Sequence, residues 1–221
     1  MINRNKLKTG GDRVSELTAG RLAVYLRCLN LLDTDGTKTV SSKVLAEQFH
    51  LNAAQIRKDL AYFGEFGVRG VGYYIKELKS HLRQILGLDR KVHVAIFGAG
   101  NLGMALADYP GFRQEGFVIV GLFDTAHSKV GHRSRGGVRI FDLADFRKMA
   151  RKERISIAVL AVPAAAAQGV VNMVVGCGVR AIMNFSPGSL KVPSGVKLKN
   201  VDVTVSMASL SFFLTQGNTD G

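Results

Sequence analysis

The chain has 221 residues, of which 47% are hydrophobic and 21% charged, a composition typical of a globular protein with one large or two small domains. No apolar run approaches the roughly 20 residues that span a bilayer, and residues 1–13 lack a signal-peptide core, so we expect a cytoplasmic protein without a membrane partner. Cys28 and Cys177 form no CxxC motif, and no metal site is predicted. The net charge of +13 favours a polyanionic partner, although both halves of the chain share the excess.

Three helices are predicted near the N-terminus. Apolar residues recur at helical spacing over residues 21–32, and a turn follows. Ser41 and Ser42 are typical caps of a second, short helix, and both are also candidates for DNA contacts. After a three-residue connection a third helix begins, where Asn52 and Gln55 form an approximate capping box. This order and spacing predict a helix-turn-helix motif.

The third predicted helix, residues 53–63, has two faces. Ile56, Leu60 and Phe63 share one face and should point to the core. Small Ala53 would let the start of the helix approach a DNA major groove closely. The polar side chains that project elsewhere are candidates for base and phosphate contacts: Gln55, Arg57, Lys58 and Tyr62. The alternative is that Arg57, Lys58 and Asp59 form only a solvated helix face.

Residues 63–74 alternate glycines with aromatics, which is typical of a β-hairpin wing. Arg69 and Gly70 lie at its tip, where an arginine suits a narrow minor groove. A helix with leucines at helical spacing follows over 75–86 and leads to a boundary near residues 88–91. We therefore predict a winged-helix DNA-binding domain over residues 1–88.

A β-rich apolar run, residues 92–97, leads directly into the glycine-rich sequence Gly98-Ala99-Gly100-Asn101-Leu102-Gly103. In a dinucleotide-binding turn the first glycine permits the tight turn, the second lets the backbone approach a pyrophosphate, and the third allows close packing of helix on strand. The helix N-terminus then offers N–H groups and partial positive charge to phosphates.

The next predicted strand, residues 118–123, ends in Asp124, where a carboxylate is placed to bind ribose hydroxyls. It would repel a 2′-phosphate, so NADH and NAD+ are favoured as cofactors over their phosphorylated forms. Arg133 and Arg135 are the alternative receptors for such a phosphate.

The second half alternates strands and helices, which predicts a Rossmann-like, doubly wound parallel sheet over residues 89–205. Further strands are expected at 155–162, 181–185 and 201–205, and helices at 101–108, 142–153 and 164–175. Two segments just past strand ends should line the cofactor cleft: Val162-Pro163 and Asn184-Phe185-Ser186-Pro187. Asn184 would be available to the nicotinamide, unless both segments are ordinary turns.

Nearly the whole chain resembles the Rex family of bacterial redox-sensing transcriptional repressors. The resemblance rests on motifs from both halves: Gln55-Ile56-Arg57-Lys58-Asp59-Leu60, Gly70-Val71-Gly72-Tyr73, the glycine-rich turn, Phe123-Asp124, Asn184-Phe185-Ser186-Pro187 and Leu210-Ser211-Phe212-Phe213-Leu214. It implies a homodimer that binds an AT-rich inverted-repeat operator and is released by NADH.

The resemblance also implies roles for individual residues. Residues 206–221 would form a C-terminal helix followed by a polar tail, and the helix would be exchanged between subunits. Its apolar Met207, Leu210 and Phe213 would be buried against the partner subunit. Tyr109 would lie near the nicotinamide, or else would only pack at a helix end. Arg21 and Asp202 would form a cofactor-dependent contact between domains. Ser206 stands where relatives usually carry Glu.

The function expected is a DNA-binding repressor that senses the NADH/NAD+ ratio and turns over no small-molecule substrate. The main alternative is an NAD-dependent oxidoreductase, which would need a positioned acid or base, and the histidines of the second half are isolated in sequence. A CoA-type ligand, or DNA binding that no cofactor switches, are the remaining alternatives.

Overall fold

The computed structural model describes residues 14–216, and it divides into two compact units, Met1–Arg90 and Lys91–Gly221. The basic N-terminal segment, residues 1–13, and the end of the polar tail, residues 217–221, lie outside the described residues. Among the helices of residues 14–216, none has the length and apolarity of a membrane span.

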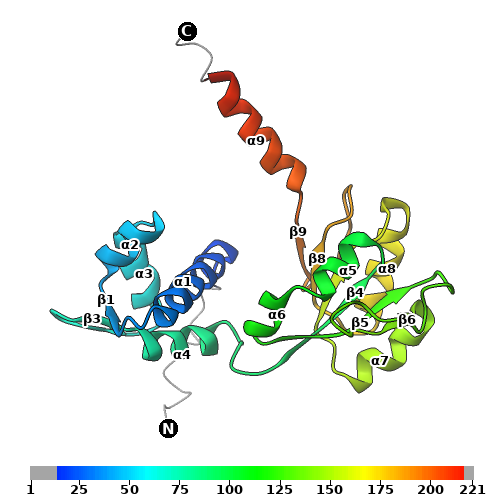
Figure 1. The fold of residues 1–221 in the computed structure, drawn as a ribbon, viewed down its shortest axis with the longest axis horizontal. Coiled ribbons are helices and arrows are strands. Elements are labelled where there is room, and N and C mark those ends of the chain that lie inside the picture. Colours follow the sequence, from blue (N-terminus) through cyan, green and yellow to red (C-terminus); the bar gives the residue numbers. More distant parts are fainter. Residues whose placement is uncertain (1–13, 217–221) are drawn as a thin grey trace. The chain divides into compact units, whose positions relative to one another are not determined.

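The first unit is a winged helix (Figure 1). Its elements are α1 (Glu16–Thr34), β1 (Thr39–Val40), α2 (Ser42–Phe49), α3 (Ala53–Phe63), β2 (Gly67–Val68), β3 (Gly72–Tyr74) and α4 (Ile75–Ile85). The strands form a small antiparallel sheet in the order β1-β3-β2. The predicted helix-turn-helix is therefore α2 and α3, and the predicted wing is the β2-β3 hairpin.

Helices α1 and α4 supply much of the core of this unit. Leu22, Leu26 and Leu29 of α1 are almost fully buried, as are Leu78 and Leu82 of α4. Their i, i+4 and i, i+7 spacing places them on one face of each helix. Burial of one such leucine contributes about 2 kcal/mol, so this packing supports the platform on which α3 is held.

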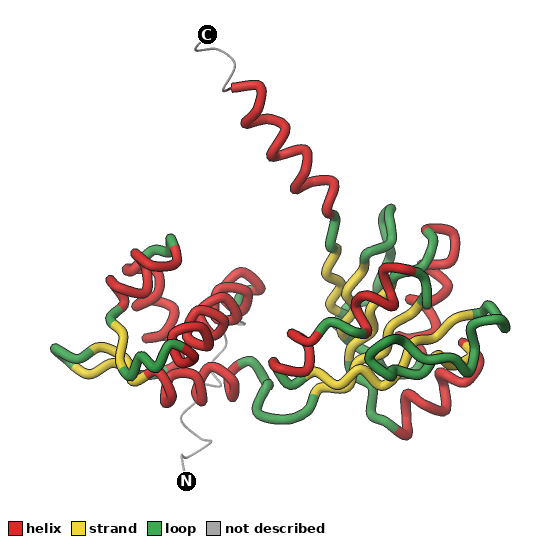
Figure 2. Tube along the Cα trace, in the orientation of Figure 1, coloured by secondary structure: helices red, strands yellow, loops and turns green. Residues whose placement is uncertain are grey.

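The second unit is a six-stranded parallel sheet with helices (Figure 2). Its elements are β4 (Val92–Phe97), α5 (Asn101–Ala107), α6 (Pro110–Gln114), β5 (Phe117–Asp124), β6 (Ile140–Asp142), the 3-10 helix η2 (Leu143–Asp145), α7 (Phe146–Lys152), β7 (Ile157–Leu160), α8 (Ala164–Gly176), β8 (Ala181–Asn184), β9 (Lys197–Asn200) and α9 (Val203–Gln216). The strand order is β6-β5-β4-β7-β8-β9, and every neighbouring pair is parallel. Numbered from β4, this is the 3-2-1-4-5-6 order of the Rossmann fold.

Both faces of the central strand β4 are buried, as expected for a doubly wound sheet. Val94 and Ile96 belong to the apolar cluster on the α5 side, whereas Ala95 and Phe97 belong to the cluster formed with α7 and α8. This division follows from the two-residue period of a strand. Phe97 also stacks on Phe123 of β5, with ring centroids 5.5 Å apart.

The predicted strand over residues 201–205 is wrong. The sixth strand is β9, four residues earlier, and Val203 already begins α9. The run of β-branched residues favours a strand, but Asp202 Oδ1 accepts hydrogen bonds from both the N–H and the hydroxyl of Thr204. Such a local side-chain bond turns the chain into a helix and overrides the weak β propensity.

Smaller differences concern short elements. The helix predicted over 142–153 is split into η2 and α7, because Asp142 accepts from the N–H of Ala144 and caps a separate turn. Strand β6 and helix α6 are too short, at three and five residues, to produce a periodic signal.

Candidate functional site

The glycine-rich turn connects β4 to α5, and two of its glycines are required by packing. Gly98 has a φ of +96°, and a Cβ there would overlap the carbonyl oxygen of Ala161. A Cβ on Gly103 would overlap the carbonyl oxygen of Gly98, so α5 can approach the strand only with glycine at that position. Gly100 differs, because no atom lies within 4 Å of the position its Cβ would occupy. The turn therefore packs tightly against the protein at Gly98 and Gly103, whereas the space beside Gly100 is free for a ligand.

Asp124, at the end of β5, is bound directly to this turn. One carboxylate oxygen accepts the backbone N–H of Ala99 at 2.7 Å, and the other accepts that of Ala126 at 2.9 Å. Lys129 Nζ lies 3.2 Å from the first oxygen. Burial alone would raise the pKa of Asp124, but the two N–H groups and the ammonium outweigh it and lower the pKa. An ionised carboxylate therefore stands beside the open side of the turn.

A cavity of about 580 Å³ lies over the carboxyl ends of β4, β5 and β7. Its lining comprises Phe97, Gly98, Gly100, Phe123, Asp124, Thr125, Lys129, Leu143, Ala161, Val162, Pro163, Ala166 and Val170. The volume is within the range of small-molecule sites, and this edge of an open α/β sheet is where such folds bind ligands. Of the predicted cofactor residues, Gly98, Gly100, Asp124, Val162 and Pro163 line this cavity. Thr125, Lys129 and Leu143 line it as well, although they carry no motif.

The loop after β8 is held by its own hydrogen bonds. Asn184, only 2% exposed, donates to the carbonyl of Ser186 and to Asn200 Oδ1, and it accepts from the N–H of Ser186. Both amide hydrogens are used inside the protein, so Asn184 shapes the loop rather than presenting a free donor. Ser186 Oγ donates to the carbonyl of Val162 and ties this loop to the one after β7. Phe185 is half-buried and Pro187 exposed.

Tyr109 lies at the start of α6 and is 57% exposed. Its ring packs edge-on against Phe112, with centroids 5.3 Å apart, and lies against Gly111. The phenol is outside the lining of the 580 Å³ cavity. Asn101 and Leu102, at the start of α5, are also exposed.

The helix-turn-helix presents a polar, basic surface. Arg57, Lys58 and Tyr62 of α3 are exposed, and so are Arg69 and Gly70 at the tip of the wing. Ser41 caps α2 by accepting the N–H of Val44, and Ser42 Oγ accepts from Arg57 Nη1 at 3.0 Å. Ala53, half-buried, begins α3. The residues predicted to contact DNA therefore lie on α2, α3 and the wing of one unit.

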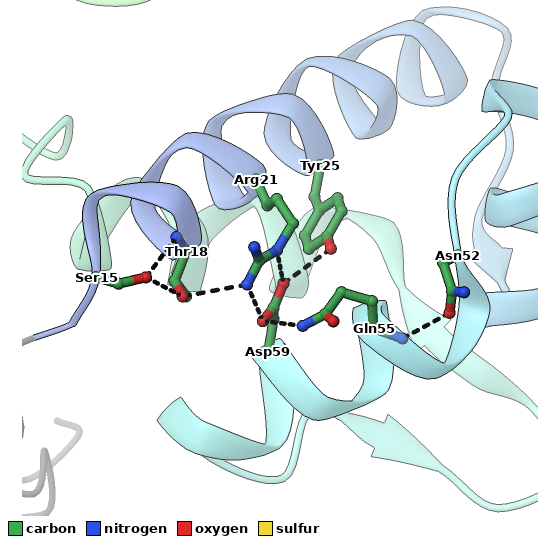
Figure 3. A network of polar contacts seen from close by, with 7 residues as sticks. All are labelled: Ser15, Thr18, Arg21, Tyr25, Asn52, Gln55 and Asp59. Carbon is green, nitrogen blue, oxygen red and sulfur yellow. Dashed lines mark hydrogen bonds and ion pairs between the residues drawn. The ribbon is translucent and has the colours of Figure 1, made fainter.

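Asp59 is not part of the solvated face, because its side chain is only 4% exposed. Figure 3 shows it at the centre of a polar network between α1 and α3. Arg21 donates to both of its oxygens, at 2.6 and 2.7 Å, Tyr25 donates its hydroxyl at 2.9 Å, and Gln55 donates its side-chain amide at 2.8 Å. The position of Asp59 three residues after Ile56, on the apolar face of α3, is the sequence signal that marks it as buried.

The ion pair with Arg21 determines the protonation of this network. The Arg21 hydrogen bond is the largest influence on Asp59 and, with those of Gln55 and Tyr25, lowers its pKa against the effect of burial. Burial, with the hydrogen bond to Asp59, raises the pKa of Tyr25 to about 12. The carboxylate is thus ionised and the phenol neutral at neutral pH.

The two residues expected to join the domains each have partners within their own unit. Arg21 also donates to Thr18 Oγ1 at 3.1 Å, besides its pair with Asp59. Asp202 accepts from Thr204. The contact between Arg21 and Asp202 stays a prediction.

Helix α9 exposes large apolar side chains. Met207, Leu210 and Phe213 are exposed by 60–66%, and Val203, Val205, Phe212 and Leu214 are similarly exposed. An apolar surface of this kind on a single chain marks an interaction site. Within residues 14–216, no group of three or more His, Cys, Asp or Glu side chains could hold a metal ion.

Comparison with known proteins finds a matching family in each unit. Residues 13–61 match a family described as "Putative DNA-binding protein N-terminus", and residues 89–188 match the "CoA binding domain" family. A redox-sensing transcriptional repressor Rex from Syntrophomonas wolfei is 45% identical over 206 residues, which cover 93% of this chain and 98% of that protein.

Solved structures agree over the same length. The crystal structure of RSP with β-NAD+ and operator DNA superposes with a TM-score of 0.86 at 38% identity, covering 94% of this chain and 95% of that one. The structure of RSP with β-NADH gives a TM-score of 0.83 at 36% identity and covers 94% and 97%. At this identity and coverage, the chain belongs to the Rex family of redox-sensing transcriptional repressors.

Proposed function

We propose that this protein is a transcriptional repressor that binds operator DNA through α3 and the wing and that responds to the NADH/NAD+ ratio. The observation that carries the proposal is the open side of Gly100 facing a cavity with the ionised Asp124, in the same chain as a helix-turn-helix with exposed Arg57 and Lys58. A sensor needs both parts: one that binds the signal and one that binds DNA.

NADH and NAD+ fit the chemistry of the cavity. The open turn at Gly100 and the N-terminus of α5 would take the pyrophosphate, and Asp124 would accept the ribose hydroxyls. An ionised carboxylate there disfavours a 2′-phosphate. The two cofactor forms differ only at the nicotinamide, in charge and ring planarity, so discrimination must arise at residues that face that ring. We assign this role to Tyr109.

The protein acts as a homodimer in this proposal, because the exposed apolar side chains of α9 need a partner surface. Two copies of α3 can then meet two half-sites of an inverted repeat about one helical turn apart. Release by NADH requires that NADH bind more tightly to the arrangement that does not match the operator. As a repressor that must reach DNA in the cell, the protein is assigned to the cytoplasm in this proposal.

We also propose that the cofactor is bound as a signal and is not turned over. The relatives carry the name of a repressor, and a hydride-transfer enzyme would need a positioned acid or base in the cavity. Among the lining residues the titratable side chains are Asp124 and Lys129, which pair with each other. Steady oxidation of NADH with carbonyl substrates would favour the enzyme instead.

The deciding experiment selects duplexes from a random pool with the full chain at fixed salt, without nucleotide, with NAD+ and with NADH. Loss of binding with NADH alone is expected. Equal binding in all three conditions would leave a DNA-binding protein that the cofactor does not switch. Arg57→Ala and Lys58→Ala then separate roles, because a base contact relaxes specificity whereas a phosphate contact weakens all sites and lowers the salt dependence.

A further inference from the structure

Gln55 lies in the first turn of α3, and its side-chain amide is fixed by Asp59 one turn later (Figure 3). The Nε2 of Gln55 donates to Asp59 Oδ1 at 2.8 Å, while the backbone N–H of Gln55 donates to Asn52 Oδ1 at 2.9 Å. The residue is therefore held by hydrogen bonds at both its backbone and its side chain. The residue is half-buried, and Figure 3 shows the oxygen of its amide on the side away from Asp59.

The chemistry of Asp59 decides which end of the amide faces it. An ionised carboxylate can only accept hydrogen bonds, so the nitrogen of the amide must point to it and the oxygen must point away. Arg21 pairs with both oxygens of Asp59 and holds the carboxylate in its ionised form. Without such a partner, the two ends of a glutamine amide are nearly equal in shape and can exchange by rotation.

We propose that Asp59 is a specificity-determining positioning residue, which orients Gln55 so that its Oε1 is offered to DNA as a hydrogen-bond acceptor. This inference rests on the proposed function. In the major groove only adenine, through N6, and cytosine, through N4, present donors, whereas guanine and thymine present acceptors at the corresponding edge. The base that Gln55 faces should therefore be adenine or cytosine.

The same network explains why a buried charge lies on the inner face of a DNA-contacting helix. An apolar side chain at position 59 could pack more easily, but it would leave both Arg21 and the Gln55 amide without their acceptor. Asp59 thus joins α1, the helix that carries Arg21 and Tyr25, to the side chain that is presented to the bases.

The test is a measurement of base preference at every operator position, by competition binding of the full chain to single-base variants of the selected duplex. The proteins compared are the parent, Gln55→Leu, Asp59→Asn and the double variant, with Gln84→Leu on α4 as the matched control on an exposed glutamine. In the parent, one position per half-site should prefer adenine or cytosine by about fivefold or more.

Gln55→Leu should abolish the preference at that position alone, and Gln84→Leu should leave every position unchanged. Asp59→Asn places an amide beside Gln55 that can donate to Oε1, so the glutamine can rotate and the preference should weaken or move to guanine or thymine. The double variant should match Gln55→Leu at this position, because the effect of Asp59 passes through Gln55.

The outcomes separate the two proposals. A parent that selects no DNA contradicts the proposed function. A parent that selects DNA, with a Gln55→Leu profile equal to its own at every position, overturns the inference. If Asp59→Asn does not fold, NMR of the parent provides the test. The side-chain NH2 signal of Gln55 is assigned by its loss in Gln55→Leu. One hydrogen of this NH2 group must be protected from exchange with solvent. An unprotected pair of hydrogens overturns the inference as well.

Discussion

Asp124, at the end of β5, accepts a 2.7 Å hydrogen bond from the backbone N–H of Ala99, in the middle of the glycine-rich turn. The carboxylate thus holds the shape of the turn in addition to facing the cavity. Ala99 is only 6% exposed, so removal of the carboxylate leaves a buried N–H without its acceptor, at a cost of about 1–3 kcal/mol.

The first prediction follows from this double role. Asp124→Ala should weaken the binding of NAD+ and NADH by similar factors of about tenfold or more, because ribose and turn are common to both forms. Titration calorimetry with each nucleotide measures this, and Asp145→Ala, at an exposed carboxylate, is the control. Loss of affinity for one form alone would contradict this account of the site.

Gly100 and Gly103 should separate ligand binding from folding. Gly103→Ala forces a methyl into the carbonyl of Gly98, and we expect the free energy of unfolding to fall by about 1–3 kcal/mol or more. Gly100→Ala has free space and an ordinary φ of −85°, so stability should stay within about 1 kcal/mol while NADH affinity falls at least about tenfold. Denaturant melts measure the stability and calorimetry measures the NADH affinity of each variant. An equal loss of stability in Gly100→Ala and Gly103→Ala would contradict this separation of roles.

Tyr109 provides the third prediction. The residue is 57% exposed, so Tyr109→Ala should change the free energy of unfolding by about 1 kcal/mol or less. The ratio of NADH to NAD+ affinity should move towards one, since the parent discriminates at the nicotinamide. Tyr109→Phe tests the hydroxyl separately. Asp124→Ala is measured in parallel as the variant expected to weaken both cofactor forms alike. If the NADH/NAD+ affinity ratio of Tyr109→Ala equals that of the parent, Tyr109 has no role in sensing.

The parts of the fold that could be predicted from the sequence are those that the residue type at a position determines. Gly98 and Gly103 are required by backbone contacts, and Asn52 caps α3 by accepting the N–H of Gln55, so the turn and the helix start both follow from residue type. The start of α9 did not follow, because the competing signals at residues 201–205 are a β-branched run and one short hydrogen bond at Asp202.

The polar network around Asp59 could not be predicted from the sequence for a different reason. The helical spacing of Asp59 from Ile56 indicates its burial, but its partner Arg21 is 38 positions away in the sequence. Only the packing of α1 against α3 brings the two side chains together. The apolar periodicity of one helix cannot identify a partner on another helix. The same holds for Asn184, whose donors are used by Ser186 and by Asn200 on the neighbouring strand.

The fourth prediction concerns pH. The pKa of Asp59 is lower in the folded than in the unfolded chain, so its stabilisation is complete above the unfolded value of about 4 and is lost as pH falls through the folded value. Asp59→Asn should lower the free energy of unfolding by about 1–3 kcal/mol at pH 7. The difference between parent and variant should shrink below about pH 4.

Denaturant melts between pH 3 and 7 measure this difference, at pH values chosen around the reference pKa of a carboxyl, about 4. Asp35→Asn, at an exposed carboxylate of the same unit, controls for general charge effects. A difference between the parent and Asp59→Asn that grows as pH falls would have the wrong sign and would contradict an ionised, hydrogen-bonded Asp59.

The last prediction tests the assembly through α9. Leu210 is 60% exposed in the single chain, and in a homodimer formed through this helix it would be buried. Leu210→Asp would then place an unpaired charge in an apolar interface, so the dimer dissociation constant should rise at least about tenfold. Ser211→Asp, exposed on the same helix, adds the same charge and should have a smaller effect. Sedimentation across a concentration series distinguishes them, and a parent that is monomeric throughout would exclude α9 as a dimerisation element.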